Sequence, residues 1–161
     1  MRYLNGDLIA AAKWGSFDVI AQCCNCQNTM KSGIAPLIAR AFPEAHAADQ
    51  ATAKGSKDKL GHFSVGVVEE PKLLVYNLYG QFGYWNRRQG KMDLSYEALD
   101  KSLSGMRSDI ITRGLVRDLK GHVRVGVPKM GAGLAGGDWN IISGMIESYL
   151  GIFDLTVVVK E

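Results

Sequence analysis

The sequence predicts an α/β protein in which helices pack against a largely parallel β-sheet. Short apolar segments of strand length alternate with segments in which apolar residues recur every three or four positions, the spacing of a helix that buries one face. Two loops rich in glycine or polar residues lead from a predicted strand into a predicted helix. Because parallel neighbouring strands need crossover connections, usually helices, this alternation predicts an α/β sandwich.

The first half of the chain is predicted to contain three strands and one helical region. Residues 17–21 form an apolar run typical of a buried strand. The following helix has one apolar face, made by Ile34, Leu37, Ile38, Ala41 and Phe42. Pro43 lies at the end of this face, where the helix breaks or restarts. Residues 63–68 and 73–79 predict two further strands, joined by a turn at residues 69–72.

The second half begins with a polar, aromatic loop at residues 80–91, followed by a helix with Asp93 as its predicted N-cap. The buried face of this helix consists of Leu99, Leu103, Met106 and Ile110. Residues 123–127 alternate valine with other residues and predict a strand, and a glycine loop follows at residues 131–138. The third helix points four residues inward: Ile142, Met145, Ile146 and Tyr149. Residues 155–159 predict the last strand.

Length and composition fit one domain spanning residues 1–161. The chain has 161 residues, of which 47% are hydrophobic and 22% charged, and these values exclude intrinsic disorder. The net charge of +3 is small and the basic residues are scattered along the chain, so the sequence does not predict nucleic-acid binding. A weak positive charge does suit an anionic small ligand. No apolar run has membrane-spanning length, and the N-terminus turns polar too early for a signal peptide. We therefore expect a soluble, cytoplasmic monomer with no membrane partner and no nucleic-acid groove.

The cysteines of this chain do not form a pattern typical of a disulfide framework or a metal site. Cys23, Cys24 and Cys26 lie within four residues, and an odd, clustered set indicates a reducing compartment. The sequence has no second cysteine cluster, and its three histidines are not at ligand spacing. We expect free thiols on or beside a strand, no metal and no cofactor.

Two loops that follow predicted strands have the composition of phosphate-binding turns. Residues 25–33 and residues 131–138 combine glycine with polar residues, and each loop precedes a helix. Glycine lets backbone N–H groups approach phosphate oxygens, and a helix N-terminus adds positive potential. Either loop alone is equally compatible with an ordinary turn. Two such loops after neighbouring strands would form a two-sided phosphate clamp.

The second loop also fits the G-x-G-x-x-G pattern of dinucleotide-binding sites, through Gly131, Gly133 and Gly136. Such a site needs an acidic residue about 20 positions further on, followed by the rest of the sheet. Glu161 is the only acid at that strand tip, and no further strand follows it in the sequence. A dinucleotide site is therefore the disfavoured alternative.

In this order, the motifs resemble those of the macro domain family, which binds ADP-ribose. Residues 4–8 (LNGDL) are similar to the family's N-terminal signature, and residues 20–26 (IAQCCNC) to a strand that ends in a ribose-binding asparagine. Residues 32–35 (SGIA) resemble the turn before the first helix, and residues 127–134 (VPKMGAGL) the phosphate loop. The resemblance covers nearly the whole chain. It implies a three-layer α/β/α sandwich with a mixed, largely parallel sheet of about six strands.

The resemblance also implies a ligand site. Asp7, with Leu8 beside it, would accept a hydrogen bond from the adenine amino group, and Asn25 would hold the distal ribose. The turns around the diphosphate would comprise Ser32, Gly33, Ile34, Gly131, Ala132, Gly133 and Leu134. The aromatic residues Tyr84 and Trp85 are suited to wall the ribose. Structural roles compete at two positions, because Asp7 is also typical of a turn and Asn25 of a strand end bonded to local backbone.

The catalytic candidates are Asn25, Asn28 and Asp138. Asp138 closes the glycine loop near the expected distal ribose, where a carboxylate would orient or deprotonate a water molecule. An equal alternative is that Asp138 is the N-cap of the helix beginning at Trp139.

Three residues or segments depart from the family pattern. Gln22 stands where phosphatase-like members carry a histidine, and residues 76–81 lack the lysine that the glycohydrolase-like branch uses for a covalent intermediate. Lys160 falls where an aromatic residue stacks on adenine in other members, and a lysine there would give a weaker cation–π contact. Binding of ADP-ribose is thus better supported than either chemistry.

Three functions remain open. Residues 24–26 (CNC) and 42–45 (FPEA) resemble the branch that removes phosphate from ADP-ribose 1″-phosphate. Residues 128–134 (PKMGAGL) and 95–99 (SYEAL) resemble the branch that removes ADP-ribose from acidic side chains, so an ADP-ribosylated protein or nucleic acid is the alternative substrate. The third function is a non-catalytic module that binds ADP-ribose or a derivative.

Overall fold

Six strands form one mixed sheet across the part of the chain that the computed structural model describes, residues 1–115 and 121–160. The strand order is β1-β6-β5-β2-β4-β3, and only the β3–β4 pair is antiparallel. The strands are β1 (Arg2–Asn5), β2 (Val19–Cys24), β3 (Phe63–Val68), β4 (Leu73–Tyr79), β5 (Arg124–Val127) and β6 (Asp154–Val159). The predicted fold class is confirmed.

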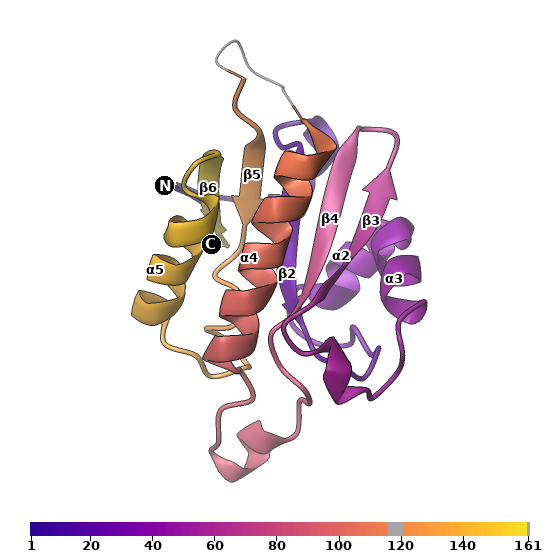
Figure 1. The fold of residues 1–161 in the computed structure, drawn as a ribbon, viewed down its shortest axis with the longest axis vertical. Coiled ribbons are helices and arrows are strands. Elements are labelled where there is room, and N and C mark those ends of the chain that lie inside the picture. The colour runs from indigo at the N-terminus through magenta and orange to yellow at the C-terminus, as the bar shows by residue number, and fades with distance from the viewer. Residues whose placement is uncertain (116–120, 161) are drawn as a thin grey trace.

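Helices cover both faces of the sheet. Helices α4 (Tyr96–Arg113) and α5 (Trp139–Leu150) pack on one face, in front of the sheet in Figure 1. The other face is covered by α1 (Leu8–Trp14), α2 (Ala35–Ala41) and α3 (Pro43–Gln50). Two short 3-10 helices, η1 (Lys57–Lys59) and η2 (Asn86–Gln89), lie in loops. None of the described helices is both long and apolar enough to cross a membrane.

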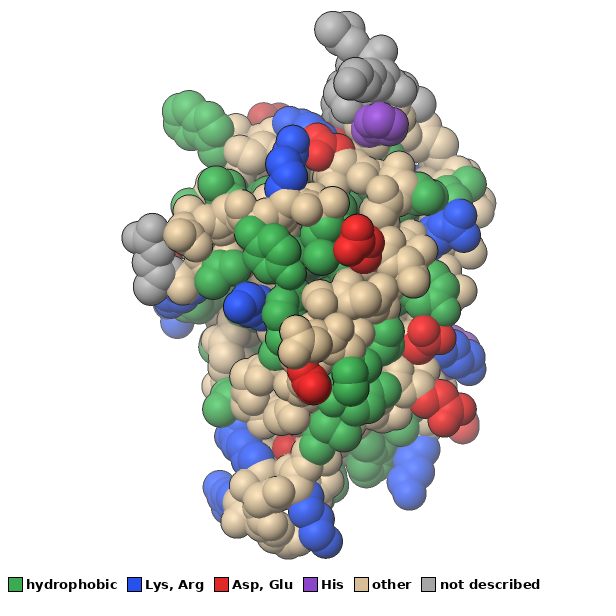
Figure 2. Space-filling view, turned by 90° about the vertical axis from the view of Figure 1, so that its left-hand side faces the viewer, with side chains coloured by type: hydrophobic (Ala, Val, Ile, Leu, Met, Phe, Trp, Pro, Cys, Tyr) green, Lys and Arg blue, Asp and Glu red, His purple; other side chains and the backbone are tan. Residues whose placement is uncertain are grey.

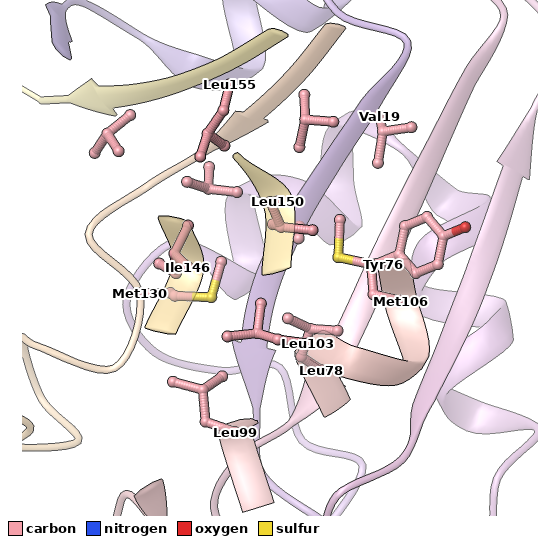
Figure 3. Packing of buried hydrophobic residues seen from close by; sticks show 14 of the residues in the cluster. Val19, Tyr76, Leu78, Leu99, Leu103, Met106, Met130, Ile146, Leu150 and Leu155 are labelled. Carbon is pink, nitrogen blue, oxygen red and sulfur yellow. The ribbon is translucent and has the colours of Figure 1, made fainter. Parts of the chain in front are cut away.

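The core lies in two layers because side chains alternate between the faces of each strand. Along β2, Val19 and Ala21 join the cluster under α4 and α5, whereas Ile20 joins the cluster under α1, α2 and α3. Figure 3 shows how Leu103 of α4 and Ile146 of α5 pack within the first cluster. The predicted apolar face of α4 is confirmed, since all four of its residues are buried.

The helix boundaries agree with the predicted signals except at one cap. The helical region breaks at Pro43, where α3 begins, because proline lacks an N–H donor and is tolerated in a first turn. The prediction of Asp93 as the N-cap of α4 is wrong. Ser95 caps that helix through its hydroxyl, which accepts from the Ala98 N–H at 3.1 Å. The Asp93 carboxylate instead accepts from the Asn86 N–H at 3.1 Å, within the preceding loop.

The sheet has a topological switch between β2 and β5, which are parallel neighbours. After β2 the chain passes through α2 and α3 and returns on one side of the pair; after β5 it passes through α5 and returns as β6 on the other side. The loops after β2 and β5 therefore diverge toward opposite faces and leave an opening at the carboxyl edge of the sheet, where α/β proteins bind ligands. The prediction that both loops follow neighbouring strands is confirmed.

Candidate functional site

Two adjoining cavities occupy this opening. The glycine-loop cavity, of about 230 Å³, lies between residues 30–35 and residues 128–135. The N-terminal cavity, of about 710 Å³, lies between the start of α1, α2 and the end of β6. The two cavities share four lining residues: Gly33, Ile34, Pro128 and Lys129. They form one continuous cleft, within the size range of about 300–1,000 Å³ typical of small-molecule sites.

Most residues predicted to bind a ligand line this cleft. The glycine-loop cavity is lined by Asn25, Ser32, Gly33, Ile34, Tyr84, Gly131, Gly133 and Leu134. Asp7 and Leu8 line the N-terminal cavity, together with Lys160. Among the described residues, Asn28, Trp85, Ala132 and Asp138 belong to neither wall.

The two turns of the cleft have the backbone geometry that glycine provides. Gly33 and Gly131 have positive φ angles of 67° and 73°, which residues with a Cβ rarely adopt. The N–H of Gly137 donates to the carbonyl of Gly131 at 2.8 Å and closes the second turn. Among the described residues, the N–H groups of these turns that have no hydrogen-bond acceptor include those of Gly33, Ile34, Gly133 and Leu134. The cleft therefore offers unpaired main-chain donors from both sides.

Asn25 lies in the cavity wall, but its amide is held by its own loop. Its Nδ2 donates to the hydroxyl of Thr29 at 2.9 Å, and its Oδ1 accepts from the N–H of Gln27 at 2.8 Å. Asn25 therefore has the local structural role that was the alternative to ribose binding. The second Nδ2 proton and the second lone pair of Oδ1 are left for a ligand.

Asn28 is bonded on the far side of its loop. Its Nδ2 donates to the carbonyl of Thr52 at 3.0 Å, and its Oδ1 accepts from the ammonium group of Lys59. Its backbone has a positive φ of 57°, tolerated by asparagine better than by most residues. These contacts hold the side chain outside the cavity wall, and a catalytic role for Asn28 stays a prediction.

Asp138 is the N-cap of α5. It is exposed, and its Oδ1 accepts from the N–H of Asn140 at 2.9 Å. Its own N–H donates to the hydroxyl of Tyr96 at 2.9 Å. The N-cap interpretation is confirmed. Asp138 is not among the described residues that line either cavity. Its additional catalytic role stays a prediction.

Asp7 combines a cap with a position in the N-terminal cavity. Its Oδ1 accepts from the N–H groups of Ile9 and Ala10 at 2.9 and 3.1 Å and begins α1. One carboxylate oxygen is enough for this cap, so the other is left to accept a hydrogen bond from a ligand.

The charge of the protein is concentrated in the cleft. Its described walls contain six cationic residues: Lys13, Lys31, Arg40, Arg87, Lys129 and Lys160. They contain two carboxylates, those of Asp7 and Asp49. The excess of positive charge in the walls thus exceeds the net charge of +3 of the whole chain. Lysine and arginine also gather at the lower end of the molecule in Figure 2, where Figure 1 shows the loop of η2. Such a cleft attracts an anion.

Asp49 is a functional candidate that the sequence analysis missed. It lies on α3, lines the glycine-loop cavity and is only 1% exposed. Its Oδ1 accepts from the hydroxyl of Tyr79 at 2.7 Å, whereas its buried Oδ2 has no hydrogen-bond partner among the described residues. The available signal was an aspartate four positions after Ala45, on the buried face of a helix.

The cysteines are free thiols, and the two in the cavity wall are poor nucleophiles. Burial raises the pKa of Cys23 from 9.0 to about 12. Burial, together with the nearby Asp49 carboxylate, also raises the pKa of Cys24. Both thiols are therefore protonated near pH 7. The described residues contain no group of three or more histidine, cysteine or acidic side chains that could hold a metal ion.

Two glutamines occupy the positions where the family pattern differs. Gln22 is buried away from the cleft, and its Nε2 donates to the Oδ1 of Asn77 at 2.9 Å. Gln81, just beyond the end of β4, lines the glycine-loop cavity and donates from Nε2 to the carbonyl of Gly83 at 2.8 Å. A neutral amide thus stands beside the cavity at the end of the segment that lacks a lysine.

Comparison with known proteins gives the chain two curated relatives. It is 30% identical over 161 residues to the uncharacterized 17.5 kDa protein in the tk-vs intergenic region of enterobacteria phage T4, with 98% of this chain and 95% of the relative covered. It is 28% identical over 157 residues to the ADP-ribose glycohydrolase OARD1 of Homo sapiens, with 98% and 88% covered. No family model matches the sequence.

Solved structures share the fold over nearly the whole chain. A protein of unknown function from Bacteroides thetaiotaomicron superposes with a TM-score of 0.75 at 25% identity and covers 99% of this chain and 98% of its own. The macrodomain of Thermus aquaticus DarG gives 0.70 at 20% identity, with 99% and 97% covered. Thermosipho africanus DarTG in complex with ADP-ribose gives 0.69 at 15% identity, with 99% of this chain and 41% of that chain covered.

The mixed sheet, the two helical layers and the cleft at the carboxyl edge define an α/β protein with the macrodomain fold. Because it matches its relatives and these structures over nearly its whole length, the chain belongs to the macro domain family.

Proposed function

We propose that this protein binds ADP-ribose 1″-phosphate along the cleft and hydrolyses its phosphate ester at the distal ribose. The observation that carries the proposal is the continuity of two cavities with different chemistry, joined where two glycine turns meet. The N-terminal cavity suits a nucleoside, the shared boundary suits a diphosphate and the glycine-loop cavity suits a polar, charged group.

The nucleoside end is supported by the walls of the N-terminal cavity. Leu8, Ile9 and Val158 provide apolar surface for a flat ring, and the free oxygen of Asp7 provides an acceptor for an amino group. Lys160 lines the same cavity and would approach the ring as a cation rather than as a stacking aromatic.

The diphosphate is supported by the boundary between the cavities. Gly33 and Ile34 line both cavities, Gly133 and Leu134 line the glycine-loop cavity beside them, and all four have unpaired N–H groups. Main-chain donors of this kind bind phosphate oxygens without the conformational cost of ordering long side chains. Lys129, in the wall of both cavities, adds a positive charge.

The terminal phosphate is supported by the charges of the glycine-loop cavity. Lys31, Arg87 and Lys129 are exposed cations in its wall, and Asn25 retains one donor and one acceptor site for the ribose hydroxyls. Cations and backbone donors aimed at a phosphoryl group stabilise charge that develops during its transfer.

Calorimetry and phosphate release test the proposal together. The purified protein is titrated with ADP-ribose 1″-phosphate, ADP-ribose and AMP, and inorganic phosphate is followed in parallel. We expect binding to weaken from the first ligand to the last and phosphate to be released from the first. Equal affinity for AMP and ADP-ribose would contradict the assignment of the glycine-loop cavity to the distal ribose.

The second candidate is removal of ADP-ribose from a modified macromolecule. It is favoured by the 28% identity to a human ADP-ribose glycohydrolase and by the opening of the cavity to solvent between exposed side chains. Incubation with mono-ADP-ribosylated protein, followed by loss of label, separates it from the phosphatase. Tight binding without turnover of either substrate would select the non-catalytic module.

A further inference from the structure

We propose that Asp49 is the general base of the reaction at the distal ribose. In this role its Oδ2 takes the proton of the water molecule that attacks the scissile bond in the glycine-loop cavity. The assignment rests on the proposed function and deepens it. Asp138 was a candidate because it follows the glycine loop in the sequence, whereas Asp49 is a carboxylate that lies in the cavity wall itself.

The burial of Asp49 is the first argument. The residue is 1% exposed, yet one of its carboxylate oxygens has no hydrogen-bond partner among the described residues. A buried, unsatisfied carboxylate oxygen is unfavourable for folding and calls for a physical reason, and a catalytic role is one such reason. A carboxylate only accepts hydrogen bonds, so the group that completes it is a donor such as water or a ligand hydroxyl.

The second argument is elimination within the cavity wall. The thiols of Cys23 and Cys24 are protonated, because burial raises the pKa of both. Lysine and arginine carry their protons near pH 7, and amides do not accept them. Among the described residues that line this cavity, there is no histidine and Asp49 is the only carboxylate. It is therefore the one side chain of this wall suited to take a proton from water.

The third argument is the way in which Asp49 is held. The hydroxyl of Tyr79 donates to its Oδ1 at 2.7 Å, and the hydroxyl of Thr52 donates to its backbone carbonyl at 2.6 Å at the end of α3. Burial raises the pKa of Tyr79, so this donor stays protonated. The ammonium group of Lys59 lies 4.7 Å from the centre of the Tyr79 ring. One carboxylate oxygen is fixed by these contacts, and the other is left for the reaction.

The chemical step balances without a cofactor. The water oxygen forms a bond to the phosphorus of the 1″-phosphate while its proton moves to Oδ2 of Asp49. The bond between phosphorus and the 1″-oxygen breaks, and the leaving oxygen takes a proton from solvent to give ADP-ribose. Inorganic phosphate is released and Asp49 returns its proton to solvent. Exposed Lys31 and Arg87 in the same wall offset the repulsion between the carboxylate and the phosphate.

The decisive variant is Asp49→Asn, which retains an acceptor for Tyr79 but cannot take a proton. We expect kcat for phosphate release to fall by about 10²-fold or more, the usual range for removal of a general base. The calorimetric affinity for ADP-ribose and the melting temperature should stay close to those of the parent protein. Asp58→Asn, at an exposed carboxylate of η1, is the matched control and should keep the parent rate.

Rescue separates a base from a structural carboxylate. Asp49→Ala leaves room beside the cavity, and added formate should raise its rate in proportion to formate concentration. Should neither Asp49 variant fold, Tyr79→Phe removes the hydroxyl that fixes the carboxylate. A lower kcat with unchanged ADP-ribose affinity in this variant would support the assignment, and an unchanged kcat would refute it.

The outcomes distinguish the inference from the function on which it rests. Parent-level activity in Asp49→Asn, with an active parent protein, would overturn the role of Asp49 alone. Failure of the parent protein to hydrolyse either substrate class would remove the proposed function and this assignment with it. Loss of ADP-ribose affinity together with activity in Asp49→Asn would show a binding residue and overturn the role as a base.

Discussion

The glycine loop contains two glycines whose replacement by alanine should have opposite consequences. Gly133 has no positive φ, and a Cβ built on it would meet no atom within 4 Å. The free protein therefore has no need of glycine there. A Cβ on Gly137 would lie 2.4 Å from the Leu94 side chain and 2.7 Å from the carbonyl of Gly131. That glycine is required by packing.

These distances set the expected magnitudes. Gly133→Ala should leave the free energy of unfolding unchanged or raise it by about 0.4–1 kcal/mol, because alanine restricts the unfolded chain. Its added methyl group lies on the turn that we propose approaches the diphosphate, and ADP-ribose should bind about tenfold more weakly, a loss of about 1.4 kcal/mol. Gly137→Ala should lower the free energy of unfolding by about 1–3 kcal/mol through overpacking.

Thermal unfolding and calorimetric titration with ADP-ribose measure both effects. Gly144→Ala is the matched control, because Gly144 lies on the exposed surface of α5 with nothing within 4 Å of a built Cβ. It should stabilise the protein to a similar degree as Gly133→Ala and leave binding unchanged. If Gly133→Ala bound ADP-ribose as tightly as the control, the second turn would not approach the ligand, and the reasoning would be refuted.

Three further perturbations have defined outcomes. Asp7→Asn should keep the cap of α1 but replace the free carboxylate oxygen with an N–H donor, so calorimetric affinity for ADP-ribose should fall about tenfold while the melting temperature is retained. Asp138→Ala should lower the free energy of unfolding by about 1 kcal/mol in denaturant titrations, from loss of the α5 cap; a parent rate of phosphate release would place Asp138 outside the chemistry. Folding raises the pKa of Cys23 from 9.0 to about 12 through burial. The free energy of unfolding should therefore be fully retained below pH 9 and decline as the pH rises from 9 toward 12. Cys23→Ala should reduce this decline, as measured by denaturant titrations at stepped pH.

The strands and helices with a buried face were predictable because their signals are local. Apolar residues at strand or helix spacing record which side of an element faces the core, as in β3, β4 and the buried face of α4. Strand β1 and helix α1 gave no such signal. All four residues of β1 are exposed, and it is a strand because it pairs with β6, more than 150 positions away.

Caps and catalytic candidates were harder because several residue types compete within a few positions. Asp93 and Ser95 are both typical N-caps, and the choice was made by the bond from Asn86 to Asp93. Asn28 and Asp138 follow the expected loops in sequence, yet their hydrogen bonds turn them toward Lys59 and toward the start of α5. Adjacency in sequence does not determine the direction of a side chain.

By itself, the sequence determined the class of fold and the two glycine turns, because each depends on patterns within a few residues. Tertiary structure decided which polar groups meet. Asp49 reaches the glycine-loop cavity only because α3 packs over β3 and β4 and the Tyr79 hydroxyl holds its carboxylate, an arrangement that joins residues 30 positions apart. Nonlocal packing of this kind leaves no periodic mark in a sequence, because it depends on where whole elements come to rest on the sheet.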